Sequence, residues 1–174
     1  MDLFSQFDDE DKNYLPTGGI VNYYEGMIPH DKATNYLKQL LKNIKWENDT
    51  FYIAGKNSLV WCDTSFELTS SKKEKKGYAW TEDLLELKTA VESITNEIFN
   101  SCLLNLYHTG EDGLGWHSDS EKGAVASLSL GAMRKFVFKH KKTKQKVAFN
   151  LSNGDLLVMK GNTQENWLHT VPRT

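Results

Sequence analysis

Two stretches in the first half of the chain carry apolar residues at helical spacing. The first opens after Pro29, and its apolar stripe consists of Ala33, Tyr36, Leu37, Leu40 and Leu41. The second follows Thr81, a residue type suited to an N-terminal cap. Its apolar face consists of Leu84, Leu87, Val91, Ile94 and Ile98. Because spacings of three and four residues bring side chains to one side of a helix, both stretches predict amphipathic helices.

The period of the pattern changes from residue 101 onward. Short segments rich in β-branched and aromatic residues alternate there with turns that contain glycine or asparagine. We expect strands over 102–107, 124–130, 134–140, 146–151, 155–159 and 167–171. Strands that follow a pair of helices predict an α+β fold, with an antiparallel sandwich or barrel in the second half.

Composition places the chain among globular proteins. Its 174 residues, 39% hydrophobic and 25% charged, suit one domain over 1–174. No apolar run approaches the ~18 residues that a membrane span needs. The chain starts with an acidic segment that lacks the basic and then apolar pattern of a secretory signal. We therefore expect an acidic leader over 1–28 and a cytoplasmic protein, or a nuclear one in a eukaryote, that is not secreted.

Positive charge is concentrated in two runs, although the net charge is only −2. The run over 134–146 holds seven basic residues and no acid, and a shorter run covers 72–76. A single run of this kind is typical of a solvated turn, whereas two runs in one small domain favour a surface for a polyanion. Both interpretations stay open here. No segment indicates a protein partner, so we expect a monomer.

Three residues of metal-binding type stand out in the second half. His117 and Asp119 are two positions apart, so in an extended segment their side chains point to the same side. His169 lies in the last expected strand, which a return of the sheet would bring beside the pair. Two imidazoles and one carboxylate with open positions suit non-haem Fe(II), although zinc accepts a similar set. On spacing alone, a chance pair with an unrelated histidine is the alternative.

Polar residues alternate with apolar ones on two of the expected strands. Asn105 and Tyr107 share one face, opposite Leu104 and Leu106, and Ser127 repeats the pattern on the next strand. Polar side chains that face inward need hydrogen-bond partners, which a bound polar ligand provides. Ordinary solvent exposure of one face of an antiparallel sheet explains the same alternation.

Residues 97–173 resemble the AlkB family of Fe(II)- and 2-oxoglutarate-dependent dioxygenases, which oxidatively remove alkyl groups from nucleic-acid bases. The similar segments, in matching order and spacing, are 99–100, 105–107, 115–121, 126–131, 134–138, 153–159 and 167–169. The resemblance implies a double-stranded β-helix (jelly roll) core over 101–172 with the N-terminal helices packed on it. It also implies Fe(II) as cofactor and 2-oxoglutarate and O2 as co-substrates.

The resemblance assigns a role to each matching position. The implied iron ligands are His117, Asp119 and His169, which are also the catalytic residues. The implied contacts to 2-oxoglutarate are Asn105, Tyr107 and Ser127. The implied substrate contacts are Glu121, Phe66, Trp61 and Arg134. Among these, Glu121 would read the damaged base, and Phe66 and Trp61 would stack on it from a nucleotide-recognition lid over 50–82.

The implied activity is direct DNA repair by oxidative dealkylation of 1-methyladenine and 3-methylcytosine, with alkylated DNA as partner. An RNA demethylase of the same fold is an alternative. The family also carries an arginine well beyond the distal histidine that pairs with the far carboxylate of 2-oxoglutarate. Here only Arg173 follows His169, too close to match that position. This departure predicts weak binding of 2-oxoglutarate, and it opens a further alternative, a catalytically silent module that binds nucleic acid.

Overall fold

The computed structural model describes residues 12–46, 78–120 and 123–174 in full, and residues 56–62, 68–70 and 73–75 by their backbone. These residues form two compact units. The first contains the chain up to Lys38 together with Leu114–Pro172, and the second contains Gln39–Gly113. Helix α1 (His30–Asn43) contributes to both. Among the described helices, none has the length and hydropathy that a membrane span requires.

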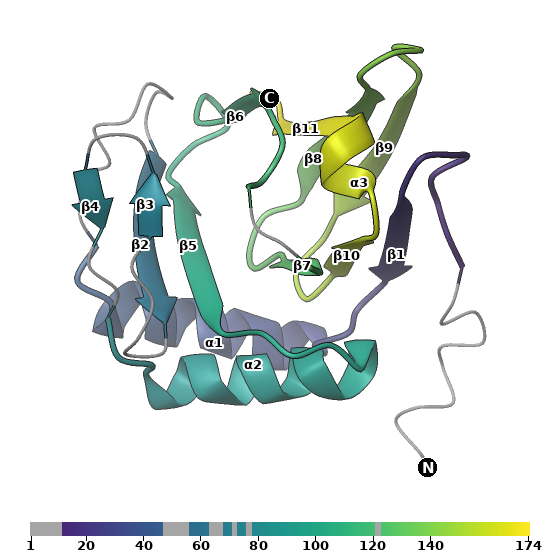
Figure 1. Cartoon of the computed structure of the whole chain (residues 1–174). Coiled ribbons are helices and arrows are strands. Elements are labelled where there is room, and N and C mark those ends of the chain that lie inside the picture. Colours follow the sequence, from purple (N-terminus) through teal and green to yellow (C-terminus); the bar gives the residue numbers. More distant parts are fainter. Residues whose placement is uncertain (1–11, 47–55, 63–67, 71–72, 76–77, 121–122) are drawn as a thin grey trace. The chain divides into compact units, whose positions relative to one another are not determined.

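The first unit contains two antiparallel sheets (Figure 1). In chain order, the strands of the three-stranded sheet are β1 (Ile20–Tyr24), β7 (Val125–Leu128) and β10 (Leu156–Lys160). The strands of the four-stranded sheet are β6 (Leu114–His117), β8 (Arg134–His140), β9 (Lys146–Leu151) and β11 (Trp167–Val171). A single-turn helix, α3 (Thr163–Asn166), joins β10 to β11. Paired strands follow the orders β1-β10-β7 and β6-β11-β8-β9.

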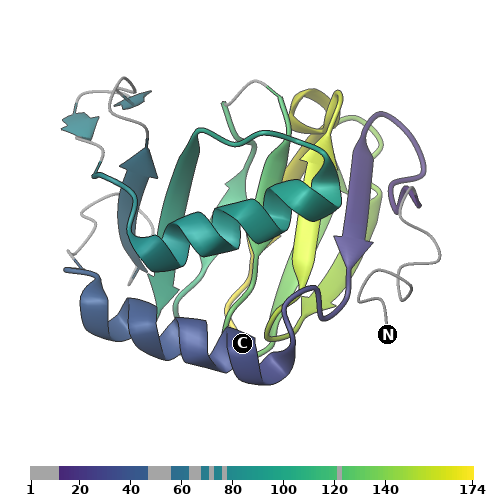
Figure 2. The same cartoon turned by 90° about the horizontal axis from the view of Figure 1, so that it is seen from below.

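The core of the first unit lies between these two sheets. β10 is the central strand of its sheet, with β1 beside it (Figure 2), and four of its five residues are buried. The rings of Tyr23 on β1 and Phe149 on β9 pack at 5.6 Å between centroids, so the inner faces of the two sheets are in contact. Phe138 and Trp167 are fully buried in the same layer. This packing is the sandwich that the alternation along these strands predicts.

A buried carboxylate ties β1 to the turn before β10. Asp155 is 2% exposed. It accepts hydrogen bonds from the backbone N–H groups of Gly26 (2.8 Å) and Ser152 (2.7 Å) and from the Tyr23 hydroxyl (2.7 Å). Burial, with the Asp155 contact as second cause, raises the pKa of Tyr23, so the phenol stays protonated and donates. Three donors therefore compensate the cost of burying this charge.

The second unit contains helix α2 (Glu82–Thr95) and two strand pairs, β2 (Lys56–Cys62) with β5 (Ser101–Tyr107) and β3 (Leu68–Ser70) with β4 (Lys73–Lys75). β2 and β5 lie side by side in both views (Figures 1 and 2), with Lys56 opposite Tyr107. The Thr81 side chain accepts a hydrogen bond from the Leu84 backbone N–H and caps α2, as the sequence predicts.

The structure corrects the sequence predictions at several positions. α2 ends at Thr95 because Asn96 adopts a left-handed conformation, so Ile98 lies outside the helix and is 90% exposed. Leu41 on α1 is exposed as well. The sequence did not predict strands β1, β2, β3, β4 and β6 or helix α3, and β1 falls within the range assigned to an acidic leader. Strands β8, β9 and β11 have the predicted bounds, and the α+β class is confirmed.

Candidate metal centre

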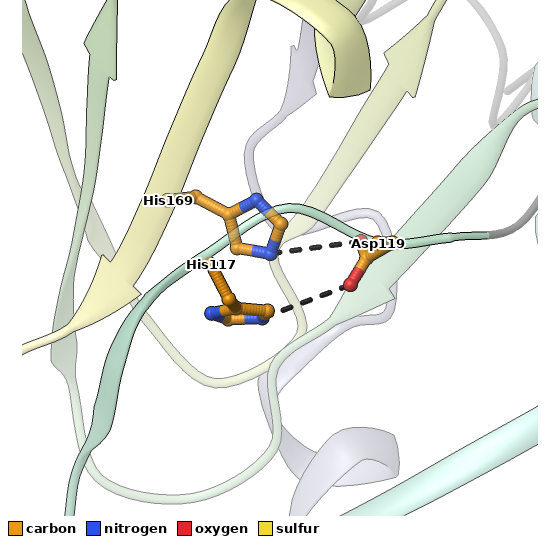
Figure 3. Close-up of side chains that lie close together, drawn as sticks. All are labelled: His117, Asp119 and His169. Atoms are coloured by element: carbon orange, nitrogen blue, oxygen red, sulfur yellow. Dashed lines mark ion pairs between the residues drawn. The ribbon is translucent and has the colours of Figure 1, made fainter. Parts of the chain in front are cut away.

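Three side chains of the first unit converge as the sequence predicts (Figure 3). His117 ends β6, Asp119 follows two residues later, and His169 lies on β11 directly opposite His117 in the strand register. Asp119 Oδ1 lies 3.7 Å from His117 Nε2, and Asp119 Oδ2 lies 3.5 Å from His169 Nε2. One potential ligand atom from each residue falls within 4.8 Å of the other two. The three donors can therefore bind one metal ion.

A β-bulge sets the orientation of the His117 ring. Between the pairs His169–His117 and Val171–Leu114, β11 advances two residues while β6 advances three, so β6 carries one extra residue. The carbonyl of Gly115 in this bulge accepts a hydrogen bond from His117 Nδ1 at 2.8 Å. A proton on Nδ1 leaves the lone pair on Nε2, the nitrogen that faces Asp119. The bulge thus selects the tautomer that metal binding needs.

His169 is buried among aromatic side chains. The residue is 5% exposed, and Phe136 from β8 stacks on its ring with centroids 5.3 Å apart and planes 15° apart. Burial, with the nearby His117 ring as second cause, lowers the pKa of His169 from its ordinary 6.5 to about 3. The imidazole is therefore neutral at physiological pH, and its Nε2 lone pair is available to a cation.

Gln164 on α3 holds Asp119 with both ends of its amide. Gln164 Oε1 accepts a hydrogen bond from the Asp119 backbone N–H at 2.9 Å, and Gln164 Nε2 donates to Asp119 Oδ2 at 3.2 Å. A backbone N–H can only donate, so this contact fixes which end of the amide is oxygen and turns the nitrogen toward the carboxylate. Asp119 is therefore oriented before any ion arrives.

Lys141 in turn fixes the backbone of Gln164. Lys141 Nζ donates to the Gln164 carbonyl at 2.8 Å and to Ser118 Oγ at 3.3 Å. Because Ser118 lies between His117 and Asp119, Lys141 connects α3 to the segment that carries these two residues. This contact gives Lys141 a structural role that the charge run did not reveal. The sequence signalled neither Gln164 nor Lys141, because their partners are 23 or more residues away along the chain.

The other residues singled out in the sequence are distributed over both units. Ser127 lies on β7, opposite Leu157 in the register. Arg134 begins β8, and its guanidinium donates to the Pro172 carbonyl at 3.0 Å. Asn105 and Tyr107 lie on β5 in the second unit. Trp61 is placed on β2 by its backbone alone, and Glu121 and Phe66 lie outside the described residues. Their roles in binding 2-oxoglutarate and substrate stay predictions.

Comparison with known families gives this geometry its context. The family model described as the 2OG-Fe(II) oxygenase superfamily matches residues 20–174. The chain belongs to this superfamily. Its members use Fe(II), 2-oxoglutarate and O2, which confirms the expected cofactors for the family. Two imidazoles and one carboxylate, which leave other coordination positions open, are the donor set that non-haem Fe(II) takes in such oxygenases, so the three residues fit the metal.

The curated relatives of this 2OG-Fe(II) oxygenase confirm the resemblance to the AlkB family. The chain is 29% identical to DNA oxidative demethylase ALKBH2 from Arabidopsis thaliana over 91% of its own length and 63% of the relative's. It is 31% identical to alpha-ketoglutarate-dependent dioxygenase alkB homolog 3 from Mus musculus over 91% of its own length and 62% of the relative's. The chain therefore spans less than two thirds of each of these relatives.

Solved structures support the jelly-roll fold of the oxygenase. OsALKBH1 superimposes with a TM-score of 0.63 at 20% identity, covering 92% of this chain and 88% of that one. A prolyl-4-hydroxylase from Pseudomonas putida superimposes with a TM-score of 0.61 at 11% identity, covering 88% of this chain and 85% of that one. The predicted double-stranded β-helix with helices is thereby confirmed, while the division of the chain into one domain with a lid stays a prediction.

Replacement of Gln164 by alanine is expected to weaken metal binding by roughly 10–100-fold, because outer hydrogen-bond partners of metal ligands contribute that much. Titration of the metal-free protein with Co(II), followed by visible absorption, measures the change without requiring turnover. The neighbouring Glu165→Ala is the matched control, since Glu165 is exposed on the same helical turn. Equal affinities of Gln164→Ala and the parent would show that Asp119 needs no support from α3.

Proposed function

We propose that this chain is an Fe(II)- and 2-oxoglutarate-dependent dioxygenase that repairs DNA by removing methyl groups from 1-methyladenine and 3-methylcytosine. The observation that carries the proposal is the convergence of His117, Asp119 and His169 in a member of the oxygenase superfamily. The names of the curated relatives, a DNA oxidative demethylase among them, support a nucleic-acid substrate.

In the proposed reaction, His117, Asp119 and His169 would hold the metal, each with one ligand atom. Fe(II), 2-oxoglutarate and O2, when bound, would supply the oxidation of the methyl group, with succinate, CO2 and formaldehyde as products. The buried Phe136 and Phe138 rings beside His169 keep water from that ligand. Asn105 and Tyr107 would hold a carboxylate of 2-oxoglutarate, with Ser127 nearby, as the AlkB resemblance implies.

Selection of the damaged base is proposed to depend on Glu121. Methylation at a Watson–Crick nitrogen gives adenine or cytosine a positive charge, which a carboxylate favours over the neutral, undamaged base. At ~4 Å and an effective dielectric constant of ~20, such a charge pair gains roughly 4 kcal/mol before desolvation. A base inside a duplex must first be flipped out, and Phe66 and Trp61 would then stack on it while Arg134 lines the nucleotide side.

The proposal predicts that the parent chain, supplied with Fe(II), 2-oxoglutarate and O2, releases one formaldehyde for each 1-methyladenine that it converts to adenine in a DNA oligonucleotide. Glu121→Gln should lower this rate by at least tenfold, because the charge pair is removed, and should lower the rate on a neutral N6-methyladenine oligonucleotide much less. Chromatography of digested oligonucleotides measures both conversions. Glu25→Gln, an exposed acid of the first unit, is the matched control.

Three outcomes would contradict parts of the proposal. Equal reductions on charged and neutral bases would remove Glu121 from base selection. Conversion of RNA at a higher kcat/KM than DNA would make the chain an RNA demethylase. If the chain binds the oligonucleotide but releases neither formaldehyde nor succinate, it is a catalytically silent module that binds nucleic acid.

A further inference from the structure

The outer face of the four-stranded sheet carries a hollow on the side away from the metal ligands. Side chains alternate along β11, so His169 points inward while Thr170, its neighbour, points outward. The same alternation separates His117 from Trp116 on β6. The hollow has a volume of about 350 Å³ and is lined by Trp116, Lys135, Val137, Lys146, Ala148, Thr170 and Pro172. We call these residues, together with Lys139, the Trp116 surface.

Positive charge on the Trp116 surface is not balanced by nearby acids of the same strands. Lys139 on β8 lies directly opposite Lys146 on β9, and like charges in this position destabilise a sheet. Lys135 lies on the same side of β8, four residues before Lys139, or about 13 Å along the strand. Residues 134–146 contain no acid. A ligand with several negative charges would therefore relieve a repulsion built into the sheet.

Trp116 supplies a flat apolar surface among these lysines. Trp116 is 39% exposed, which is unusual for a residue of this size, and it points outward because it alternates with the inward His117 along β6. Lys139 Nζ lies 4.0 Å from the centroid of its ring and Lys146 Nζ lies 5.9 Å from it. Both lysines have long flexible side chains, so their ammonium groups can move to phosphates without moving the strands.

An aromatic ring flanked by lysines is the combination by which proteins hold single-stranded nucleic acid, with a base on the ring and phosphates on the cations. We propose that the Trp116 surface binds single-stranded DNA, with one base stacked on Trp116 and neighbouring phosphates paired with Lys135, Lys139 and Lys146. Duplex DNA fits less well because its base faces are covered by stacking. The choice of DNA as the polyanion rests on the proposed function, whereas the binding itself requires no turnover.

The test measures binding of an unmodified 12-nucleotide oligothymidylate to the full chain by fluorescence anisotropy over a range of salt concentrations. Trp116→Ala should weaken binding about tenfold, because one base can no longer stack. The double variant Lys139→Gln/Lys146→Gln should lower the slope of log affinity against log salt by about 1.4, since each lysine that pairs with a phosphate adds about 0.7 to the slope. Lys12→Gln is the matched control, because Lys12 lies over the Tyr14 ring at 5.1 Å, a similar pair outside the Trp116 surface.

Several results would overturn the inference. If the lysine double variant keeps the affinity and the salt slope of the parent chain, the Trp116 surface does not bind the oligonucleotide. This result decides the question even if Trp116→Ala fails to fold. Tighter binding of a duplex, or equal competition by polyglutamate, would make the surface a site for another polyanion. If the parent chain demethylates no base and the variants bind the oligothymidylate more weakly, the proposed function is refuted and the Trp116 surface is supported. Parental binding by variants of an active demethylase would refute only the surface.

Discussion

Replacing Asp119 by alanine is expected to abolish metal-dependent decarboxylation of 2-oxoglutarate and to leave the fold intact. Asp119 supplies the only negative charge among the three converging donors, and it follows β6 rather than lying within it. Its removal should weaken Co(II) binding by more than the roughly 10–100-fold expected for removal of an outer hydrogen-bond partner. Titration with Co(II) and release of labelled CO2 from 2-oxoglutarate measure the two effects separately.

Two further variants make this result specific. Asp119→Asn keeps the size of the side chain and removes its charge, so it should bind metal almost as poorly as Asp119→Ala. Asp31→Ala removes an exposed acid from the first turn of α1 and should change neither measurement. Parental decarboxylation by Asp119→Ala would show that the assignment of the metal ligands is wrong.

Replacing Asp155 by alanine is expected to lower the free energy of unfolding by about 3–5 kcal/mol. The substitution leaves the backbone N–H groups of Gly26 and Ser152 and the Tyr23 hydroxyl without the acceptor that they share. For a chain of this length, such a change lowers the midpoint of thermal unfolding by about 10 °C. Calorimetry and urea denaturation followed by circular dichroism measure the change.

Asp31→Ala is again the control, and its expected cost is below about 1 kcal/mol because that acid is exposed and only interacts with the helix dipole. An unfolding midpoint of Asp155→Ala within about 2 °C of the control, on the order of 1 kcal/mol or less, would show that water replaces the carboxylate. The junction between β1 and β10 would then not depend on this network.

The sequence predicted strands correctly where apolar and polar residues alternate clearly along the chain. On β8 the inward Phe136 and Phe138 alternate with the outward Lys135 and Lys139, and the strand has the predicted bounds. β6 contains Gly115 and a bulge, so its short segment shows no clean period, and it was missed. The spacing of two metal ligands indicated their convergence, but the position of His169 depends on strand register, which no local pattern encodes.

Contacts between distant segments explain the remaining differences. Gln164 lies 45 residues from Asp119 on a helix of four residues, too short to produce a periodic signal. β1 was missed because both of its faces are largely covered, and a five-residue strand of this kind does not alternate between apolar and polar residues. The AlkB resemblance compensated for these gaps at the metal ligands, where family motifs are local.

Trp116 and His117 are neighbours in the chain that serve opposite faces of one sheet, which determines how this protein tolerates insertions and deletions. Because side chains alternate, a one-residue change in the length of β6 would exchange the two residues and remove the metal ligand and the outer aromatic ring together. Substitutions, by contrast, can alter either face alone. Length variation should instead be tolerated in the exposed hairpin turn between β8 and β9, around residues 142–144.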